Sequence, residues 1–395
     1  MALTQAHVMN TYGRMPLALV RGKGTYVWDA DGRRYIDFVT GVAVNSLGHC
    51  HPRVVEAITT AASTLIHCSN HYHIASQARL AALLTAKAGL GKAFFCNSGA
   101  ESVESAIKLA RRYAKEFVSS ERYEIITAIN SFHGRTMGAV SATGQEKYHK
   151  GFEPMLPGFS YVPLNDEAAL RKAFNSKTAA VMLEPIQGEG GVQPCTQAYL
   201  ALARELCSKA GVPLIFDEVQ TGLGRTGKWF AFQHYNIQPD IITLAKALGG
   251  GVPIGCILAN DQVAQGFVPG THASTFGGNP LATNAALATM QVMEEEGLVE
   301  QAATIGRFIK ARLTALAEKY PQLVAQVRGE GCLIGMQLHV PAAPLVKAVL
   351  AKGLLINAAG SNVLRLLPPL NASTDEIEAA LTIIEEVLAE QVASC

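Results

Sequence analysis

The fold is decided by two stretches, Leu214-Ile215-Phe216-Asp217-Glu218-Val219-Gln220 and Ile241-Ile242-Thr243-Leu244-Ala245-Lys246. Each begins as a short apolar run and reaches a charged residue. Short apolar runs bounded by turn signals are typical of strands buried on both faces, as in a parallel sheet. Open α/β sheets bind their ligands in the crevice outside the carboxyl ends of the strands. We therefore expect Asp217 and Lys246 to face one binding site.

A carboxylate and a lysine at such an edge favour one cofactor. Pyridoxal phosphate needs an amine for its aldehyde and an anion for its ring nitrogen. A structural ion pair between Asp217 and Lys246 is the plainer alternative. If the two residues instead serve opposite ends of one cofactor, they should not touch each other.

Composition narrows the class of protein. The 395 residues are enough for two or three domains with a large core. Hydrophobic residues make up 49% and charged residues 16% of the chain, and this apolar balance predicts a covered subunit interface. The formal net charge is +1, and no basic block is present. The chain thus lacks the electrostatic footprint of a nucleic-acid-binding protein.

Neither a membrane span nor a metal site is expected. No apolar run approaches the ~20 residues of a membrane helix, and the first residues do not form a signal-peptide pattern. His49 and His51 lack the spacing of zinc ligands, as do His71 and His73. The eight cysteines are scattered without a Cys-x-x-Cys pair, which predicts free thiols and a cytoplasmic location.

The order of predicted elements indicates an α/β fold with a mostly parallel central sheet flanked by helices. Asp31-Gly32 lies between two strand-like runs and predicts a hairpin. From Tyr320-Pro321 onward, the pattern becomes that of a compact α+β unit. We predict three segments: 1–50 as part of a small domain, 51–280 as the large cofactor-binding domain and 281–395 as the C-terminal small α+β domain.

The stretch Asn97-Ser98-Gly99-Ala100-Glu101 opens a helix predicted over 100–116. Ser98 and Glu101 match a capping box. Ser98, Gly99 and Ala100 also leave bare N–H groups at the helix N-terminus, and such an end binds phosphate through its free donors and dipole. The two interpretations are compatible.

Three further residues each have a functional and a structural interpretation. Phe132 follows the strand predicted over 124–129 and could stack on a flat ring, while Arg135 could clamp a carboxylate. A packed Phe and a solvated Arg are equally compatible with the spacing. Arg365 lies inside an apolar strand, which favours an ion pair or a carboxylate-binding role.

The stretch Gly222-Leu223-Gly224-Arg225-Thr226-Gly227-Lys228 imitates two nucleotide-binding motifs. Trp229 stands where a P-loop needs Ser or Thr, and the residues that follow do not open a helix cleanly. We expect a mobile loop over the site instead.

Together these motifs resemble the class III pyridoxal-phosphate aminotransferases, and the resemblance covers nearly the whole chain. The order and spacing of the motifs are specific for that family. It implies the fold of the fold-type I transferases. The matching motifs are 12–17, 41–49, 95–101, 131–136, 184–191, 217–227, Lys246 and 275–280.

The resemblance implies a role for each matched residue. Lys246 would hold the cofactor through its aldehyde and then shuttle a proton, which requires a lowered pKa. Asp217 would keep the pyridine nitrogen protonated. Thr275 would reach the phosphate of the neighbouring subunit's cofactor, so the active unit would be a homodimer. The other implied cofactor contacts are Ser98, Gly99, Ala100, Phe132, Glu218, Val219 and Gln220.

The implied reaction moves an amino group from N2-acetylornithine to 2-oxoglutarate, giving N-acetylglutamate 5-semialdehyde and glutamate. It would be a ping-pong cycle through pyridoxamine phosphate, in arginine biosynthesis. Arg135 and Ser274 would hold the donor. Glu189 and Arg365 would act as a switch: the closed pair admits the donor's distal amine, and the open pair frees Arg365 for the α-carboxylate of glutamate.

Several alternatives stay open. Related enzymes on the same fold use succinylornithine, ornithine, N-succinyl-diaminopimelate or 4-aminobutyrate as donors. An aminomutase, which keeps the amine on one molecule, is a rival from another enzyme class. A nucleotide-binding module built on residues 222–228 is a third.

Overall fold

The central sheet has seven strands in the spatial order β4-β12-β11-β10-β7-β5-β6. The structure is a computed structural model that describes residues 1–393. Neighbouring strands from β11 to β6 are parallel, whereas β12 runs antiparallel to both β11 and β4. The predicted mostly parallel sheet is confirmed. Its strands are β4 (Lys92–Cys96), β5 (Glu124–Ala128), β6 (Phe159–Val162), β7 (Thr178–Leu183), β10 (Leu214–Asp217), β11 (Ile241–Leu244) and β12 (Gly255–Ala259).

Strands β10 and β11 are neighbours, and every residue of both is buried. Burial on both faces explains why the two runs are apolar almost throughout instead of alternating with polar residues. The parallel register places Asp217 opposite Thr243. Asp217 ends β10, and Lys246 follows shortly after the end of β11, so both reach the same edge of the sheet.

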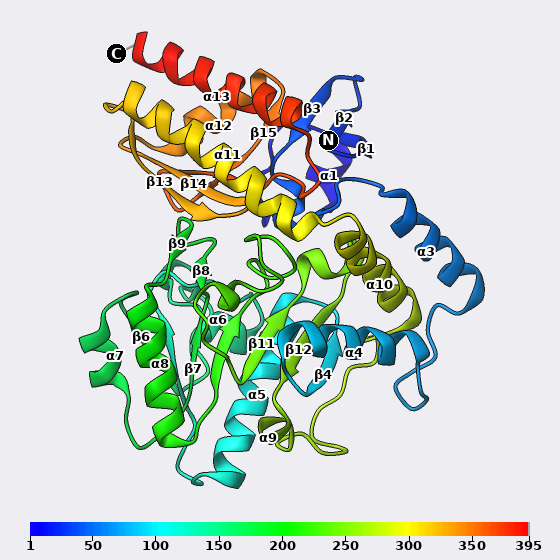
Figure 1. Cartoon of the computed structure of the whole chain (residues 1–395), viewed down its shortest axis with the longest axis vertical. Helices are drawn as coiled ribbons and strands as arrows, with labels where there is room; N and C mark the ends of the chain where they lie inside the picture. The colour runs from blue at the N-terminus through cyan, green and yellow to red at the C-terminus, as the bar shows by residue number, and fades with distance from the viewer. Residues whose placement is uncertain (394–395) are drawn as a thin grey trace.

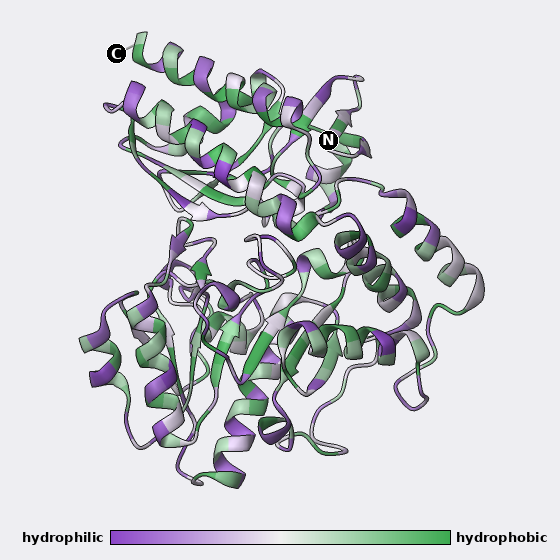
Figure 2. Cartoon of the chain, in the orientation of Figure 1, coloured by the Kyte–Doolittle hydropathy of each residue, from purple (hydrophilic) through white to green (hydrophobic). Residues whose placement is uncertain are grey.

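Helices cover both faces of the sheet (Figure 1), and successive strand residues pack to opposite sides. Ile215 packs in one apolar cluster with Ala106, whereas Leu214 and Phe216 belong to a second cluster with Leu200. Figure 2 shows strongly hydrophobic strands between helices of mixed character. The covering helices are α4 (Ala75–Ala88), α5 (Gly99–Phe117), α6 (Met137–Ala142), α7 (Glu167–Ala173) and α8 (Gln197–Ala210). Helix α10 (Pro280–Glu295) lies against α4, and α3 (Pro52–Thr64) lies against α10 at the side of the molecule.

The N- and C-terminal parts of the chain lie together above the large sheet (Figure 1). Strand β15 pairs in parallel with β3, which places Leu354 opposite Ile36. The predicted hairpin at Asp31-Gly32 is present, because β2 and β3 pair antiparallel around it. The predicted segment limits at residues 50 and 280 stay a prediction.

The elements of this terminal part are β1 (Leu19–Lys23), β2 (Tyr26–Asp29), β3 (Arg34–Asp37), α11 (Leu298–Lys319), β13 (Val324–Glu330), β14 (Leu333–Leu338), α12 (Ala342–Ala351), β15 (Leu354–Leu355), β16 (Asn357–Ala359), β17 (Val363–Leu366) and α13 (Thr374–Ala393). Strands β1, β2, β3 and β15 form one small sheet, and strands β13, β14, β17 and β16 form another. Helix α10 packs on α3 and α4, and it leads into α11.

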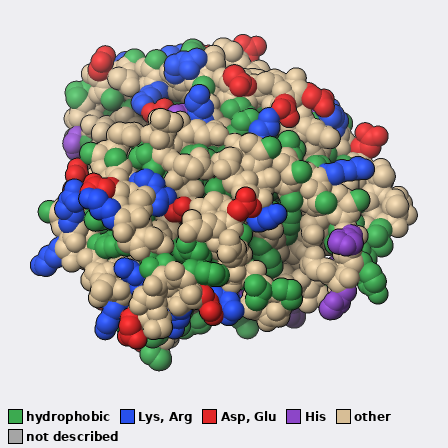
Figure 3. Space-filling view, turned by 60° about the horizontal axis from the view of Figure 1, so that its bottom comes forward, with side chains coloured by type: hydrophobic (Ala, Val, Ile, Leu, Met, Phe, Trp, Pro, Cys, Tyr) green, Lys and Arg blue, Asp and Glu red, His purple; other side chains and the backbone are tan. Residues whose placement is uncertain are grey.

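Charged side chains of both signs are mixed over the surface, as the net charge of +1 leads one to expect. Figure 3 shows Lys and Arg side chains interspersed with Asp and Glu over the face in view. None of the helices within residues 1–393 is long and apolar enough to cross a membrane.

The glycine-rich stretch 222–228 is not a loop over the site, and that expectation is corrected. All of it except Lys228 is buried. The Arg225 guanidinium donates hydrogen bonds to the carbonyls of Pro368 and Cys332 and to Ser46 Oγ, all in the terminal part of the chain. The stretch therefore joins the two parts of the molecule, because its guanidinium satisfies two buried carbonyls of the C-terminal segment and the Ser46 hydroxyl of the N-terminal segment.

Helix α11 touches the same junction at Gly306. A Cβ atom at this position would lie 2.3 Å from the carbonyl oxygen of Gly331, which is backbone and cannot swing away. Gly306 therefore permits a close approach between α11 and the turn before β14.

We expect Gly306→Ala to destabilise the protein by about 1–3 kcal/mol, because the added methyl forces α11 away from the turn. Helix propensity alone predicts the opposite sign, since Ala is favoured over Gly by about 1 kcal/mol in a helix. Thermal unfolding measures the difference. Gly13→Ala is the control, because no atom of the residues that the structure describes lies within 4 Å of its Cβ position. A higher melting temperature for Gly306→Ala would contradict the close packing.

Candidate active site

A cavity of about 470 Å³ lies at the carboxyl edge of β10 and β11. Both Asp217 and Lys246 line it, as the two apolar runs predict. The other predicted site residues in its wall are Ser98, Gly99, Ala100, Phe132, Arg135, Glu189, Val219 and Gln220. Residues from separate parts of the sequence thus converge on one hollow at the sheet edge.

Lys246 occupies a constrained position in this cavity. Its backbone φ is +45°, in the left-handed region that non-glycine residues seldom adopt. Such a conformation costs on the order of 1–3 kcal/mol and is typical of functional sites. No hydrogen bond or ion pair of its amine is found within residues 1–393, and in particular none to Asp217. The alternative of a structural ion pair between the two is therefore not supported.

Burial lowers the pKa of the Lys246 amine to about 8. Nearby Glu189 raises this pKa, while the positive charge of Arg365 lowers it further. Removing a charged amine from water disfavours its protonated form, which explains the direction. A lysine with such a pKa can both hold and release a proton near neutral pH.

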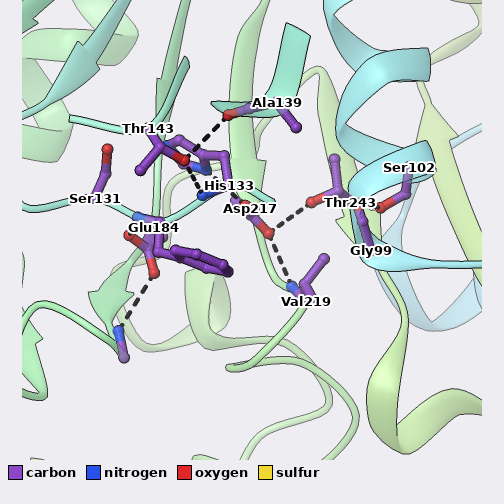
Figure 4. A network of polar contacts seen from close by, with 12 residues as sticks. Gly99, Ser102, Ser131, His133, Ala139, Thr143, Glu184, Asp217, Val219 and Thr243 are labelled. Atoms are coloured by element: carbon purple, nitrogen blue, oxygen red, sulfur yellow. Dashed lines mark hydrogen bonds and ion pairs between the residues drawn. The ribbon is translucent and has the colours of Figure 1, made fainter. Parts of the chain in front are cut away.

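Asp217 is held by donors from three parts of the chain (Figure 4). Its Oδ1 accepts hydrogen bonds from Thr243 Oγ1 at 2.8 Å and from the Val219 N–H at 3.1 Å. Its Oδ2 lies 2.7 Å from Nδ1 of His133. The carboxylate is nearly inaccessible to solvent, so these contacts determine its orientation.

His133 is a functional candidate that the sequence patterns do not single out. Burial disfavours its charged form, but the hydrogen bond and negative charge of Asp217 outweigh this, and the pKa of His133 is raised. Its backbone N–H donates to Thr143 Oγ1 at 2.9 Å, as Figure 4 shows. The one available sequence signal is its place beside Phe132, directly after a buried strand.

Glu184 is a second carboxyl group in the cavity wall. Oε2 accepts a hydrogen bond from the Phe132 N–H at 3.0 Å, and Oε1 accepts one from the Gly188 N–H at 3.3 Å. Burial raises the pKa of this carboxyl group to about 7. Glu184 directly follows the apolar strand β7, so the signal that identifies Asp217 would also have identified it.

The N-terminus of α5 forms another part of the wall. Ser98 caps the helix, because its Oγ accepts a hydrogen bond from the Glu101 N–H at 3.2 Å. The return bond of the predicted capping box goes to the Asn97 N–H instead of the Ser98 N–H. The first N–H groups of a helix lack partners inside it, and a Cβ atom on Gly99 would lie 2.8 Å from Val219 Cγ1. The end of α5 is thus a narrow, bare cradle for an anion.

Arg135 lies at the exposed side of the cavity. Its guanidinium carbon is 4.2 Å from the centre of the Tyr148 ring and 5.3 Å from that of Phe132. The two rings meet edge to face, with their centres 5.7 Å apart. Within the described residues no carboxylate pairs with Arg135, so the guanidinium is free to bind one from a ligand.

Arg365 is fully buried behind the cavity. Its Nη1 lies 2.6 Å from Glu189 Oε1 and 3.0 Å from Gln220 Oε1, and its Nε donates to Asn357 Oδ1 at 3.2 Å. Burial raises the pKa of Glu189, but the charge and hydrogen bond of Arg365, together with Lys246 and Gln220, outweigh it, and the pKa of Glu189 is lowered. The Glu189–Arg365 ion pair that the family resemblance implies is present, and it is closed.

Three predicted site residues besides Arg365 do not line the cavity. Glu218 turns away from it, and its carboxylate accepts hydrogen bonds from the Ala231 and Phe232 N–H groups at 3.0 and 2.9 Å. Ser274 and Thr275 lie in the loop before α10. Ser274 Oγ accepts a hydrogen bond from Asn97 Nδ2 at 3.2 Å, and Thr275 is exposed. Their predicted ligand contacts stay predictions.

The groups of the cavity fit pyridoxal phosphate. The molecule carries a phosphate, an aldehyde and a ring nitrogen, which need an anion cradle, an unpaired amine and a buried carboxylate. The end of α5, Lys246 and Asp217 supply these three groups in one wall. Phe132 adds an aromatic surface for a flat ring.

Comparison with known proteins identifies the family. The family model Aminotransferase class-III matches residues 8–388. The acetylornithine aminotransferase of Caldanaerobacter subterraneus is 52% identical, over 97% of this chain and 98% of its own. That of Methanocaldococcus jannaschii is 49% identical, over 98% of this chain and 97% of its own.

Solved structures agree with this placement. An ornithine aminotransferase from Toxoplasma gondii superposes with a TM-score of 0.96 at 34% identity, covering 100% of this chain and 95% of its own. An N-acetylornithine aminotransferase from Stenotrophomonas maltophilia superposes with a TM-score of 0.86 at 34% identity, covering 100% of both chains. The chain therefore belongs to the class III aminotransferases and is a pyridoxal-phosphate-dependent aminotransferase.

Proposed function

We propose that this aminotransferase takes the distal amino group of N2-acetylornithine and passes it to 2-oxoglutarate, as a step of arginine biosynthesis. One observation carries the choice of donor. Among residues 1–393, the cavity wall offers one guanidinium without a carboxylate partner, that of Arg135, while Arg365 is neutralised by Glu189. A donor with one carboxylate, an uncharged acylated α-nitrogen and a distal amine matches this charge pattern. The names of the relatives that match over the full chain point the same way.

Asp217 and Lys246 would have separate roles in the reaction. Bound pyridoxal phosphate supplies an electron sink for the carbon that carries the amine. Asp217 would hold a negative charge at the ring nitrogen, and Thr243, Val219 and His133 fix its orientation. Lys246 would move a proton at the reacting carbon, because a pKa of about 8 lets it act as a general base and acid near neutral pH.

The remaining residues position the reactants. Glu184 holds the backbone of Phe132, whose ring would cover one face of the cofactor. Ser98, Gly99 and Ala100 would bind its phosphate at the end of α5. Arg135 and Ser274 would hold the donor's carboxylate end.

Glu189 and Arg365 would let one cavity accept two substrates. The closed pair at 2.6 Å cancels the charge of Arg365 and leaves room for an uncharged carbon chain. When 2-oxoglutarate or glutamate binds, its α-carboxylate would replace Glu189 as the partner of Arg365. An unpaired buried arginine is costly, which favours an exchange of partners over simple opening.

The active unit would be a homodimer in which Thr275 reaches the partner subunit's cofactor. Thr275 is exposed and lies outside the cavity of its own chain. Exposed apolar side chains, Leu65, Ile66, Tyr72 and Phe276, occur in the neighbouring segments and would be covered by a second copy. The cysteines within residues 1–393 are free, which supports a cytoplasmic location.

A panel of donors tests the proposed substrate. With 2-oxoglutarate as acceptor, kcat/KM for N2-acetylornithine should exceed that for ornithine, succinylornithine, N-succinyl-diaminopimelate and 4-aminobutyrate by about tenfold or more, which corresponds to ~1.4 kcal/mol of transition-state binding. A higher value for another donor would replace the proposed one. Turnover without 2-oxoglutarate would indicate an aminomutase.

Glu189→Ala tests the switch. The variant leaves Arg365 without its carboxylate partner, so the guanidinium is free to bind the α-carboxylate of a substrate. Activity with α-amino donors such as glutamate should therefore rise about tenfold relative to activity with N2-acetylornithine. Glu189→Gln is the matched control, because it keeps the shape and a hydrogen-bond acceptor but not the charge, and its ratio should fall in between. An unchanged ratio in both variants would refute the switch.

The low pKa of Lys246 can be measured directly in the cofactor-free enzyme. Only the neutral amine reacts with a trace of acetic anhydride, so labelling of Lys246 should rise with pH around a midpoint of about 8. The same lysine in urea-unfolded protein is the control and should titrate near ~10.4. Mass spectrometry of the peptide gives both curves. Coinciding curves would show that the folded site does not lower the pKa.

A further inference from the structure

His272 is fastened to helix α5 by a fully assigned chain of hydrogen bonds. Its Nδ1 lies 2.8 Å from Lys108 Nζ, and its Nε2 lies 2.9 Å from Ser105 Oγ. A lysine ammonium can only donate, so Nδ1 accepts and Nε2 carries the proton. Ser105 Oγ accepts the hydrogen bond from this N–H, and its own O–H donates to the Glu101 carbonyl at 2.7 Å. Each of these three hydrogen bonds thus has a defined donor and acceptor.

Aromatic packing holds the same ring from the sides. The centre of the His272 ring is 4.7 Å from that of Phe94 and 5.0 Å from that of Phe267. Hydrogen bonds and ring contacts together determine the position of His272.

The loop that follows His272 is also fastened by Asn70, on both sides of Thr275. Asn70 Nδ2 donates to the carbonyls of Ser274 at 3.0 Å and Gly277 at 2.8 Å. Gln77 Nε2 holds Asn70 Oδ1 at 2.8 Å. Thr275 thus lies between two anchors, while its own side chain is exposed and makes no hydrogen bond within the described residues. A side chain presented in this way is positioned for a group outside its own chain.

We propose that His272 is a positioning residue for the partner subunit's cofactor: it locks the loop 272–277 onto α5 so that Thr275 is presented to that cofactor's phosphate. This inference rests on the proposed homodimer. It adds that one helix serves two active sites, because α5 forms the phosphate cradle of its own cavity at Gly99 and fastens, at Ser105 and Lys108, the loop that serves the other.

A double-mutant cycle on the holoenzyme tests this role. The measured quantity is the rate at which bound cofactor is lost after dilution into inorganic phosphate, followed by its visible absorbance. Thr275→Ala should raise this rate about tenfold, as expected for one hydrogen bond to a charged group. His272→Ala should raise it by a similar factor. The double variant should match Thr275→Ala alone, because His272 acts through Thr275.

Two further variants separate positioning from general loss of structure. His272→Gln keeps a donor for Ser105 and should restore most of the slow release. Lys108→Met removes one anchor and should raise the rate less than His272→Ala. Thermal unfolding and sedimentation of each variant check that the protein is folded and that its assembly is unchanged. A merely structural histidine would instead give additive effects in the cycle and no rescue by Gln.

The outcomes distinguish the two proposals. If Thr275→Ala leaves cofactor release unchanged, the proposed contact across the dimer fails. If Thr275→Ala accelerates release but His272→Ala does not, or if the two effects multiply, the role of His272 fails while the dimer contact stands.

Discussion

The site depends on the hydrogen bonds that hold the buried carboxylate of Asp217. Thr243 brings the end of β11 to it, the Val219 N–H closes the turn after β10, and His133 brings the loop after β5. A buried charge must be fully hydrogen-bonded, and breaking one partner of such a pair costs about 3–5 kcal/mol. The same three contacts that stabilise the carboxylate therefore align three segments of the cavity wall.

The site combines features that a stable fold would otherwise avoid. Lys246 has a positive φ and an unpaired amine, and Glu184 is a buried carboxyl group with a pKa of about 7. These costs are tolerated because β7, β10 and β11 are buried along their whole length and hold their ends rigidly. Around the cavity, charged groups of both signs lie near enough to shift one another's pKa: Arg365 lowers the pKa of Lys246 by repulsion and that of Glu189 by attraction.

Much of the site could be predicted from the sequence because its residues lie at the ends of recognisable elements. Asp217 and Lys246 follow apolar runs, and Gly99 and Ala100 open a helix. Glu218, which lies between two cavity residues in sequence, points away because it caps the backbone at Ala231 and Phe232. His133 lies in the matched motif 131–136 and Tyr148 in none, but the roles of both arise from contacts with Asp217 and Arg135 that the sequence pattern does not show.

The sequence by itself determined the parallel sheet, the edge at which Asp217 and Lys246 meet, and the family, because strand burial, helix capping and motif order are local properties. Only the tertiary structure decided that the glycine-rich stretch 222–228 is a buried junction, since its role depends on carbonyls of Cys332 and Pro368. It also decided that the Glu189–Arg365 pair implied by the resemblance is closed, and that Asp217 and Lys246 stay apart. Those facts depend on distances between remote segments, which no local pattern contains.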